Sequence, residues 1–301
     1  MKNFNNKILI VALLGLVVVF VLTKIFREPG RKSNLDLRAF ELDTASVTEI
    51  RLHPRKDTSE VTLRKTEKGW MVFARHGNGK AEAREIMNLL TSLKSLKPER
   101  IITRKKENWK QYAVSDSAAV VVKALRGDDE LLDLKIGKES AGTTYARIGD
   151  EDEVYALEGY LHDVFDRKIS DWRDQTFLHI TTQKVDKIVF TYPADSGFVL
   201  EKKNGQWLAA NEPADSAKVQ DYLNSISAVE HDLFATQQES TGDATVSISI
   251  THEGGKEIIV KGWRKSFDEW ILHSSVQPGT WFLDRGPKLA RDIFIGKSQL
   301  Q

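Results

Sequence analysis

Two segments of the chain carry the same pattern of apolar residues in the same order. In each segment a Val-x-x-Ile pair opens an expected strand, and a leucine and a tryptophan follow at matching positions. Residues 46–165 carry these features at Val47, Ile50, Leu63 and Trp70, and residues 184–294 carry them at Val185, Ile188, Leu200 and Trp207. Later elements recur in the same order, with insertions only where loops are expected. Because such recurrence marks a repeated structural unit, we predict two tandem copies of one fold.

Each copy is expected to contain one amphipathic helix. Its apolar residues recur every three or four positions, which places them on the face of a helix that packs on a sheet. These residues are Ile86, Leu89, Leu90, Leu93 and Leu96 in the first copy and Val219, Leu223, Ile226 and Val229 in the second. Asp215 or Ser216 is suited to cap the free N–H groups at the start of the second helix.

Strand-like segments dominate the rest of each copy. Val246, Ile248 and Ile250 alternate with serines, which is the period of a strand with one buried face. The order of elements lacks the strict alternation of a doubly wound parallel sheet. We therefore predict an α+β fold with two tandem repeats of a strand-rich antiparallel unit with helices. Five tryptophans in these segments are expected mainly in the cores, namely Trp70, Trp207, Trp263, Trp270 and Trp281.

One apolar segment precedes the repeats. Ile8–Leu22 is uncharged and the apolar character continues past Lys24 to Phe26, which gives the roughly 17–25 residues that a helix needs to span a bilayer. A cleaved secretory signal is the competing interpretation, but no small-x-small cleavage site follows. We predict an uncleaved transmembrane signal-anchor. The chain then divides into a tail at 1–7, the anchor at 8–26, a linker at 27–45, a first repeat at 46–168, a junction at 169–183, a second repeat at 184–295 and a tail at 296–301.

The composition limits the classes of function. Charged residues make up 29% of the chain and the net charge is +1, so no strong overall field attracts nucleic acid, and we predict no nucleic-acid partner. The absence of cysteine excludes disulfides, thiolate metal sites and cysteine nucleophiles. No histidine pair has the HExxH spacing, and no serine lies in a Gly-x-Ser-x-Gly elbow. We predict a protein that is not an enzyme, with no catalytic residue and no cofactor.

A histidine and four aspartates crowd the end of the first copy, at His162, Asp163, Asp166, Asp171 and Asp174. Oxygen ligands of this kind can bind calcium, but an EF-hand loop needs ligands at alternate positions and a glycine at its turn. Neither feature is present, and arginine and lysine residues lie between the acids. We interpret the stretch as a charged connector and predict no metal site.

A basic loop is the first candidate for contact with a partner. It contains Arg104, Lys105, Lys106, Trp109 and Lys110, and it is longer in the first copy than in the second. Basic residues interleaved with an aromatic can contact anionic headgroups or nucleic acid. For a tethered domain, headgroups or an acidic protein suit this loop better than DNA. An ordinary solvated loop is the competing interpretation.

The junction supplies the second candidate. Arg173 lies between Asp171 and Asp174, and a guanidinium can hold a carboxylate through two parallel hydrogen bonds. Because this segment joins the two copies, we predict that Arg173 fixes the angle between them by clamping these acids. Contact with a partner is the alternative role.

Several short motifs together resemble the domain-of-unknown-function 4340 family. They are the single N-terminal span, the Val-x-x-Ile strand, Ile136-Gly137, Thr144-Tyr145 leading into Val154-Tyr155, and the stretch from Asp171 to Leu178, where Trp172 replaces the family's usual leucine. The resemblance covers most of residues 40–294. The second copy departs from it, with Lys261-Gly262 in place of the Ile-Gly pair and Trp281 in place of Tyr155.

The resemblance implies a location and a kind of partner. Proteins of this family resemble single-pass proteins of the bacterial inner membrane with a periplasmic domain, often associated with ABC-type transporters, including gliding-motility auxiliary components. No catalytic residue carries over. We therefore expect a non-catalytic, membrane-anchored protein that binds or scaffolds subunits of an ABC-type transporter. The alternative is an extracytoplasmic domain that binds an envelope polymer or a small solute.

Overall fold

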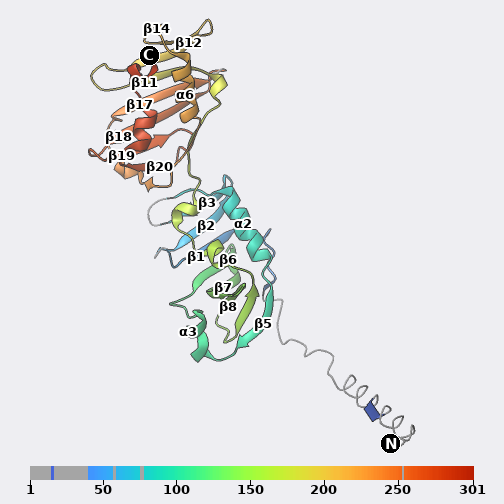
Figure 1. The fold of residues 1–301 in the computed structure, drawn as a ribbon. Helices are drawn as coiled ribbons and strands as arrows, with labels where there is room; N and C mark the ends of the chain where they lie inside the picture. The colour runs from blue at the N-terminus through green and yellow to red at the C-terminus, as the bar shows by residue number, and fades with distance from the viewer. Residues whose placement is uncertain (1–14, 17–39, 57–58, 75–77, 253) are drawn as a thin grey trace, which may run out of the picture.

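The computed structural model describes residues 15–16, 40–56, 59–74, 78–252 and 254–301. Within these residues the chain forms two strand-rich units joined by a short segment (Figure 1). The tail predicted at 1–7 and the anchor predicted at 8–26 lie outside the described residues, apart from Gly15 and Leu16. Among the residues that are described, no helix is long and apolar enough to cross a bilayer.

Unit one is a nine-stranded antiparallel sheet with the order β4-β3-β2-β1-β6-β7-β8-β9-β5. Its strands are β1 (Glu49–His53), β2 (Val61–Thr66), β3 (Gly69–Phe73), β4 (Gly79–Lys80), β5 (Pro98–Thr103), β6 (Val120–Arg126), β7 (Asp129–Ser140), β8 (Thr143–Ile148) and β9 (Val154–Glu158). Its helices are α2 (Ala83–Lys94), η2 (Lys106–Asn108), α3 (Trp109–Tyr112), α4 (His162–Phe165) and α5 (Ile169–Trp172).

Unit two is a second nine-stranded antiparallel sheet, with the order β14-β13-β12-β11-β17-β18-β19-β20-β16. Its strands are β11 (Val185–Thr191), β12 (Phe198–Lys203), β13 (Gln206–Ala209), β14 (Glu212–Pro213), β16 (Phe234–Ala235), β17 (Val246–His252), β18 (Glu257–Arg264), β19 (Glu269–Ser274) and β20 (Trp281–Arg285). Its helices are η3 (Thr182–Lys184), α6 (Ser216–Ser225), η4 (Gln237–Glu239), α7 (Lys288–Ile293) and η5 (Lys297–Leu300). When the nine strands of each sheet are numbered by themselves along the chain, both sheets have the order 4-3-2-1-6-7-8-9-5.

The strand register follows the pattern of the sequence. In unit one Ile50 lies opposite Leu63 and Lys65 opposite Trp70. In unit two Ile188 lies opposite Leu200 and Lys202 opposite Trp207. A strand places alternate residues on one face, so the alternating apolar positions fix which face of each sheet meets the core. The predicted strand-rich antiparallel class is confirmed.

Each unit has its own hydrophobic core beneath its long helix. The α2 residues Ile86, Leu89 and Leu93 are buried against the first sheet, and the α6 residues Val219 and Leu223 are buried against the second. As predicted, the second helix is capped at this end, because the Asp215 carboxylate accepts hydrogen bonds from the N–H groups of residues 217 and 218. Figure 1 shows each helix lying along its own sheet.

Two features of the cores differ from expectation. Phe40 and Leu42 lie in the predicted linker at 27–45 and are both buried in the first core. Of the five tryptophans expected mainly in the cores, Trp207 is buried and the other four are half-buried, and of these four Trp70 and Trp270 pack against the cores. An indole is so large that it is rarely buried completely.

The strand pairing also corrects the alignment of the glycines. Val120 pairs with Ile136, and the equivalent Val246 pairs with Gly262, so Gly262 corresponds to Ile136 rather than to Gly137. Gly137 lies instead in an irregularity of β7, where the register shifts between Ile136 and Glu139. One extra residue in a strand displaces every later position by one, which the sequence pattern alone did not reveal.

Candidate binding cleft at the junction

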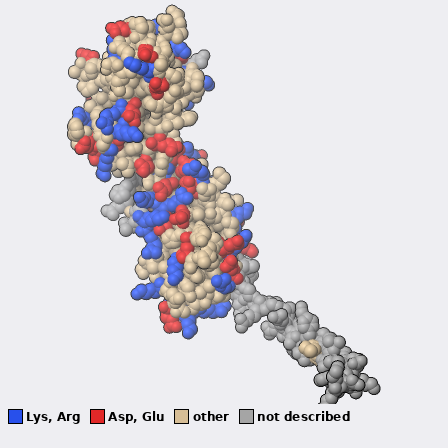
Figure 2. All heavy atoms as spheres, in the orientation of Figure 1, with Lys and Arg blue, Asp and Glu red and all other residues tan. Residues whose placement is uncertain are grey.

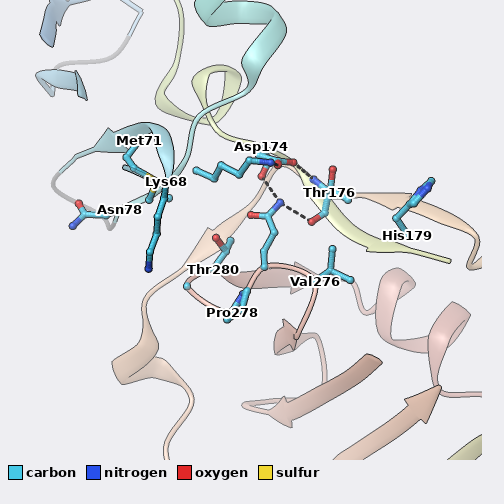
Figure 3. A pocket seen from close by; sticks show the side chains of 13 residues that line it. Lys68, Met71, Asn78, Asp174, Thr176, His179, Val276, Pro278 and Thr280 are labelled. Atoms are coloured by element: carbon cyan, nitrogen blue, oxygen red, sulfur yellow. Dashed lines mark hydrogen bonds and ion pairs between the residues drawn. The ribbon is translucent and has the colours of Figure 1, made fainter. Parts of the chain in front are cut away.

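A cleft of about 750 Å³ lies where the two units meet. Its walls come from three parts of the chain, and Figure 3 shows the side chains that line it. Unit one supplies Lys68, Met71 and Lys80, the junction supplies Asp174, Thr176 and His179, and unit two supplies the loop from Val276 to Thr280 between β19 and β20. This volume falls in the range of about 300–1,000 Å³ that is usual for ligand sites.

The junction backbone is bonded to both units. Beside β4, Asp174 N–H donates to the carbonyl of Lys80 at 2.8 Å, and Glu82 N–H donates to the carbonyl of Trp172 at 2.9 Å. The chain then forms β10 (Thr176–His179), which pairs antiparallel with β15 (Ala228–Glu230). Because the segment pairs with unit one and then with unit two, backbone hydrogen bonds fix the position of the residues that line the cleft.

Gln277 connects the loop of unit two to the junction. Its side-chain amide donates to the carbonyls of Asp174 at 3.2 Å and Thr176 at 2.8 Å. The residue is only 8% exposed, and within the described part of the protein its Oε1 atom has no hydrogen-bond partner. The amide therefore satisfies two carbonyls of the junction and leaves one acceptor without a partner beside the cleft.

An ion pair between Lys80 and Asp174 forms part of the cleft wall. Lys80 Nζ lies 2.9 Å from Asp174 Oδ2, and Thr176 N–H donates to Asp174 Oδ1 at 3.0 Å. Burial acts to raise the pKa of the Asp174 carboxyl, but the hydrogen bonds from Lys80 and Thr176 outweigh it and lower the pKa below its usual value. Lys68 extends from the β2–β3 turn toward the opening (Figure 3), and no ion pair of its ammonium occurs among the described residues.

Arg173 lies at the junction as predicted, but its predicted carboxylate partners are wrong. Its Nη2 donates to the Asn78 carbonyl at 3.2 Å, and its guanidinium carbon lies 3.7 Å from the centre of the Phe234 ring. Burial lowers its pKa to about 10. Asp171 instead accepts the backbone N–H of Lys168 at 3.1 Å at the start of α5. Arg173 thus joins the units through a cation–π contact and a carbonyl.

Gly79 makes the position of Arg173 possible. A Cβ atom at this residue would lie 2.7 Å from both Nε and Nη2 of Arg173, closer than side chains are found. The guanidinium therefore packs against bare backbone of β4. Its Nε has no hydrogen-bond partner among the residues described.

The basic loop predicted as a contact site lies elsewhere. It leads into α3 and includes its first two residues, at the end of unit one that faces away from unit two (Figure 1). Arg104 pairs with Glu153 at 3.2 Å and Lys106 with Asp152 at 3.1 Å, while Lys105 lies 3.7 Å from Glu107. These acids neutralise most of the positive charge of the loop. Figure 2 likewise shows acidic and basic side chains interspersed over one face of both units.

Trp109 in this loop has a structural environment. Its indole N–H donates to the carbonyl of Asp152 at 3.1 Å, and the buried Arg147 lies 3.8 Å from the ring centre. Lys106 lies 5.5 Å from the same ring. Lys110 is exposed, with no ion pair in the described residues. The structure therefore does not bring the loop and the junction together.

Asp166, in the acidic stretch near His162, binds the backbone of a distant segment of unit one. Asp166 accepts the backbone N–H groups of Arg55 at 2.5 Å and Lys56 at 2.9 Å, and His162 lies 3.4 Å from the same carboxylate. Within the described ranges no group of three or more His, Cys, Asp or Glu residues is arranged to hold a metal ion.

Sequence reasoning did not find most of the cleft. Of its lining residues, only Asp174 was a candidate, and Lys80, Met71 and Gln277 were missed. Gln277 and Asp174 are separated by 103 positions. The Pro278-Gly279 pair signals a turn in the sequence, but nothing in it signals which segment that turn faces.

Comparison with known proteins gives one match. No curated protein and no solved structure matches the chain. The model of one family matches residues 70–246, from β3 of unit one through the junction to the start of β17 in unit two. The matched region thus contains the Arg173 and Asp174 side of the cleft. The chain belongs to the family described as Domain of unknown function (DUF4340).

Proposed function

We propose that this protein is a non-catalytic binding protein that holds a partner in the cleft between its two units. The observation that carries the proposal is the construction of the cleft from both units and the junction at once. Hydrogen bonds from Gln277 and backbone pairing beside β4 hold the walls in place. A preformed site loses little conformational entropy on binding, which favours affinity.

The lining suits a partner that combines apolar and polar groups. Met71, Val276 and Pro278 offer apolar surface, and the Lys68 ammonium offers an exposed cation. Asn78, Asp174 and Thr176 add polar groups to the same lining. A few polar groups fixed among apolar ones orient a ligand and give specificity.

The membrane setting is part of the same proposal. The apolar segment at 8–26 supports an uncleaved anchor in the inner membrane, and the family resemblance supports periplasmic units that assist an ABC-type transporter. The matching strand order of the two sheets supports an origin by duplication of one unit. A reporter fused to the C-terminus tests sidedness, and cytoplasmic activity of the reporter would contradict a periplasmic location.

Co-purification tests the partner. The full chain, extracted in a mild detergent, is expected to retain transporter subunits. The variant Met71→Glu places a charge in the cleft and is expected to lose them. Met87→Glu is the matched control, because Met87 is 63% exposed on α2 outside the cleft. Equal retention by both variants, or no subunits with the unaltered chain, would refute the proposal.

A second candidate is a binding domain for an envelope polymer or small solute, which the size of the cleft favours. Native mass spectrometry of the detergent-extracted chain tests it. A bound small molecule that Met71→Glu loses and Met87→Glu keeps would support this candidate over a protein partner.

A further inference from the structure

A second hollow, of about 660 Å³, lies within unit two and away from the junction cleft. Aromatic residues line much of it, including Tyr192, Trp270 and Phe294. The rings of Trp270 and Phe294 stack at 24° with their centres 6.4 Å apart. At its rim, Phe267 is 80% exposed, the highest value among the large apolar residues described as exposed. Exposing a phenylalanine beside other apolar rings is unfavourable in water unless another surface covers them.

The equivalent place in unit one is filled. Strand pairing makes Thr144 the counterpart of Trp270, since the equivalent residues Ala146 and Leu272 each follow by two positions. Thr144 is fully buried, and its hydroxyl donates to the Gly159 carbonyl at 2.7 Å and accepts the Leu161 N–H at 3.1 Å. The shared strand order alone therefore does not produce the hollow. It occurs in unit two, where large aromatic residues surround it.

The charges around the hollow favour an anion. Arg264 Nε donates to the Ser266 carbonyl at 3.2 Å, and Arg291 donates to the carbonyls of Pro287 at 3.1 Å and Gly286 at 3.0 Å. These bonds hold both guanidinium groups in place and leave other N–H groups of each available. Among the described residues neither arginine forms an ion pair, and one acid, Asp268, lies beside them.

We propose that this hollow docks an acidic segment of a partner protein, which inserts an aromatic or aliphatic side chain beside Phe267. Aromatic residues and arginine are enriched at protein interfaces and lysine is depleted, and no lysine lines this hollow. A planar guanidinium can bind a carboxylate through two hydrogen bonds. Adsorption to an anionic membrane uses clusters of about 4–8 cations, more than the two present here. The inference rests on the proposed binding function but uses a separate surface.

Arrayed peptides test this docking. Short peptides with a central phenylalanine or leucine, flanked by acidic, neutral or basic residues, are probed with the full chain in mild detergent. Acid-flanked peptides are expected to bind, and binding is expected to weaken with added salt. Fluorescence polarisation then measures the affinity of the best peptide. Phe267→Ala is expected to weaken it by about tenfold or more, and Arg264→Gln by about threefold to tenfold.

Matched controls lie in unit one. Tyr160→Ala removes another aromatic that is 64% exposed, and Arg126→Gln removes another exposed arginine. Both are expected to bind the peptide as the unaltered chain does. No preference for acidic flanks, or equal weakening by Phe267→Ala and Tyr160→Ala, would overturn the proposal.

Two other occupants would also overturn it. Binding to phosphatidylglycerol vesicles that Phe267→Ala abolishes would identify a lipid surface, and a dimer that Phe267→Ala dissociates would identify a second copy of this chain. Failure here is distinct from failure of the proposed function. Met71→Glu is expected to lose transporter subunits while leaving peptide affinity unchanged, because Met71 lies in the junction cleft.

Discussion

Gln277 illustrates how one side chain can hold two units together. Its amide bonds two carbonyls of the junction from a loop of unit two. Gln277→Ala leaves both carbonyls without this donor, and we expect the free energy of unfolding to fall by about 1–3 kcal/mol. Urea denaturation monitored by tryptophan fluorescence measures this change. Gln220→Ala is the control, since among the described residues the Gln220 amide bonds only Asn224, on the exposed surface of α6. Equal losses in the two variants would contradict the structural role of Gln277.

Asp174 should make stability depend on pH. Its pKa is lowered in the folded state, because hydrogen bonds from Lys80 and Thr176 outweigh the effect of burial. A carboxyl with a lowered folded pKa stabilises the protein above its unfolded pKa of about 3.9, and this stabilisation is lost as the pH falls through the folded pKa. Asp174→Asn removes the charge. We therefore expect the unaltered chain to exceed the variant in stability at neutral pH and the difference to shrink in acid.

Urea midpoints measured from neutral pH down to below the usual carboxyl range test this prediction. Asp221→Asn is the control, because Asp221 lies on the exposed side of α6 away from the junction. A difference between Asp174→Asn and the unaltered chain that stays constant with pH would show that the carboxylate charge is not what stabilises the junction.

At the scale of elements, β7 of unit one has a feature that unit two lacks. A Cβ atom at Gly137 would lie 2.2 Å from the Tyr112 carbonyl oxygen and 2.7 Å from Val114 Cγ1. The glycine thus lets the end of α3 pack directly on the strand. Gly137→Ala must displace this segment, and we expect it to lower the free energy of unfolding by about 1–3 kcal/mol. Gly279→Ala is the control, since a Cβ atom there meets no atom within 4 Å. Thermal unfolding compares the two, and similar melting temperatures would contradict the close contact.

The sequence predicted the elements that depend on residues close to one another along the chain. Apolar spacing predicted the buried faces of α2 and α6 and the first strands of each unit, because a helix or strand places neighbouring residues in a fixed geometry. Of the residues expected on the helices, Leu96 and Ile226 lie just beyond the helix ends and Val229 lies in β15. The cap at Asp215 was predicted for the same reason. The bulge at Gly137 was missed, since it depends on α3 packing from elsewhere in the chain.

The cleft depends on contacts between distant segments, and so little of it could be predicted. Arg173 was correctly placed at the junction, but nearby acids were expected to bind it. The structure gives it Asn78 and Phe234 instead, from unit one and unit two respectively. Asp174 is bound by Lys80, which lies 94 positions away. A sequence shows which charged residues are neighbours along the chain. Which residue a junction side chain contacts depends instead on the strand edge beside which the folded junction lies.

At the scale of the whole molecule, two separate cores are joined by few but specific contacts. Both units keep the same strand order, while the two hollows use residues that differ between them. The junction cleft exists only where the units meet, and the aromatic hollow exists where Trp270 stands in place of Thr144. Binding is thus assigned to features that distinguish the units, and the shared sheets serve to position them.

The junction contacts should hold the two units at one angle. The chain has no cysteine, so nitroxide labels attach only where cysteines are introduced. Met87→Cys on α2 and Gln220→Cys on α6 are exposed positions, one in each unit. Double electron–electron resonance is expected to give one narrow distance distribution. Adding Arg173→Ala and Gln277→Ala removes the contact with Phe234 and the bonds to the junction carbonyls, and should broaden that distribution.

A label pair within unit two, Gln220→Cys with Lys261→Cys, separates loss of the junction from loss of the fold. Its distance distribution is expected to stay unchanged when Arg173 and Gln277 are replaced, because neither label lies across the junction. A broad distribution between the units in the unaltered chain would mean that the cleft is not preformed. A partner would then have to order the junction when it binds, and the conformational entropy lost in that ordering would lower its affinity.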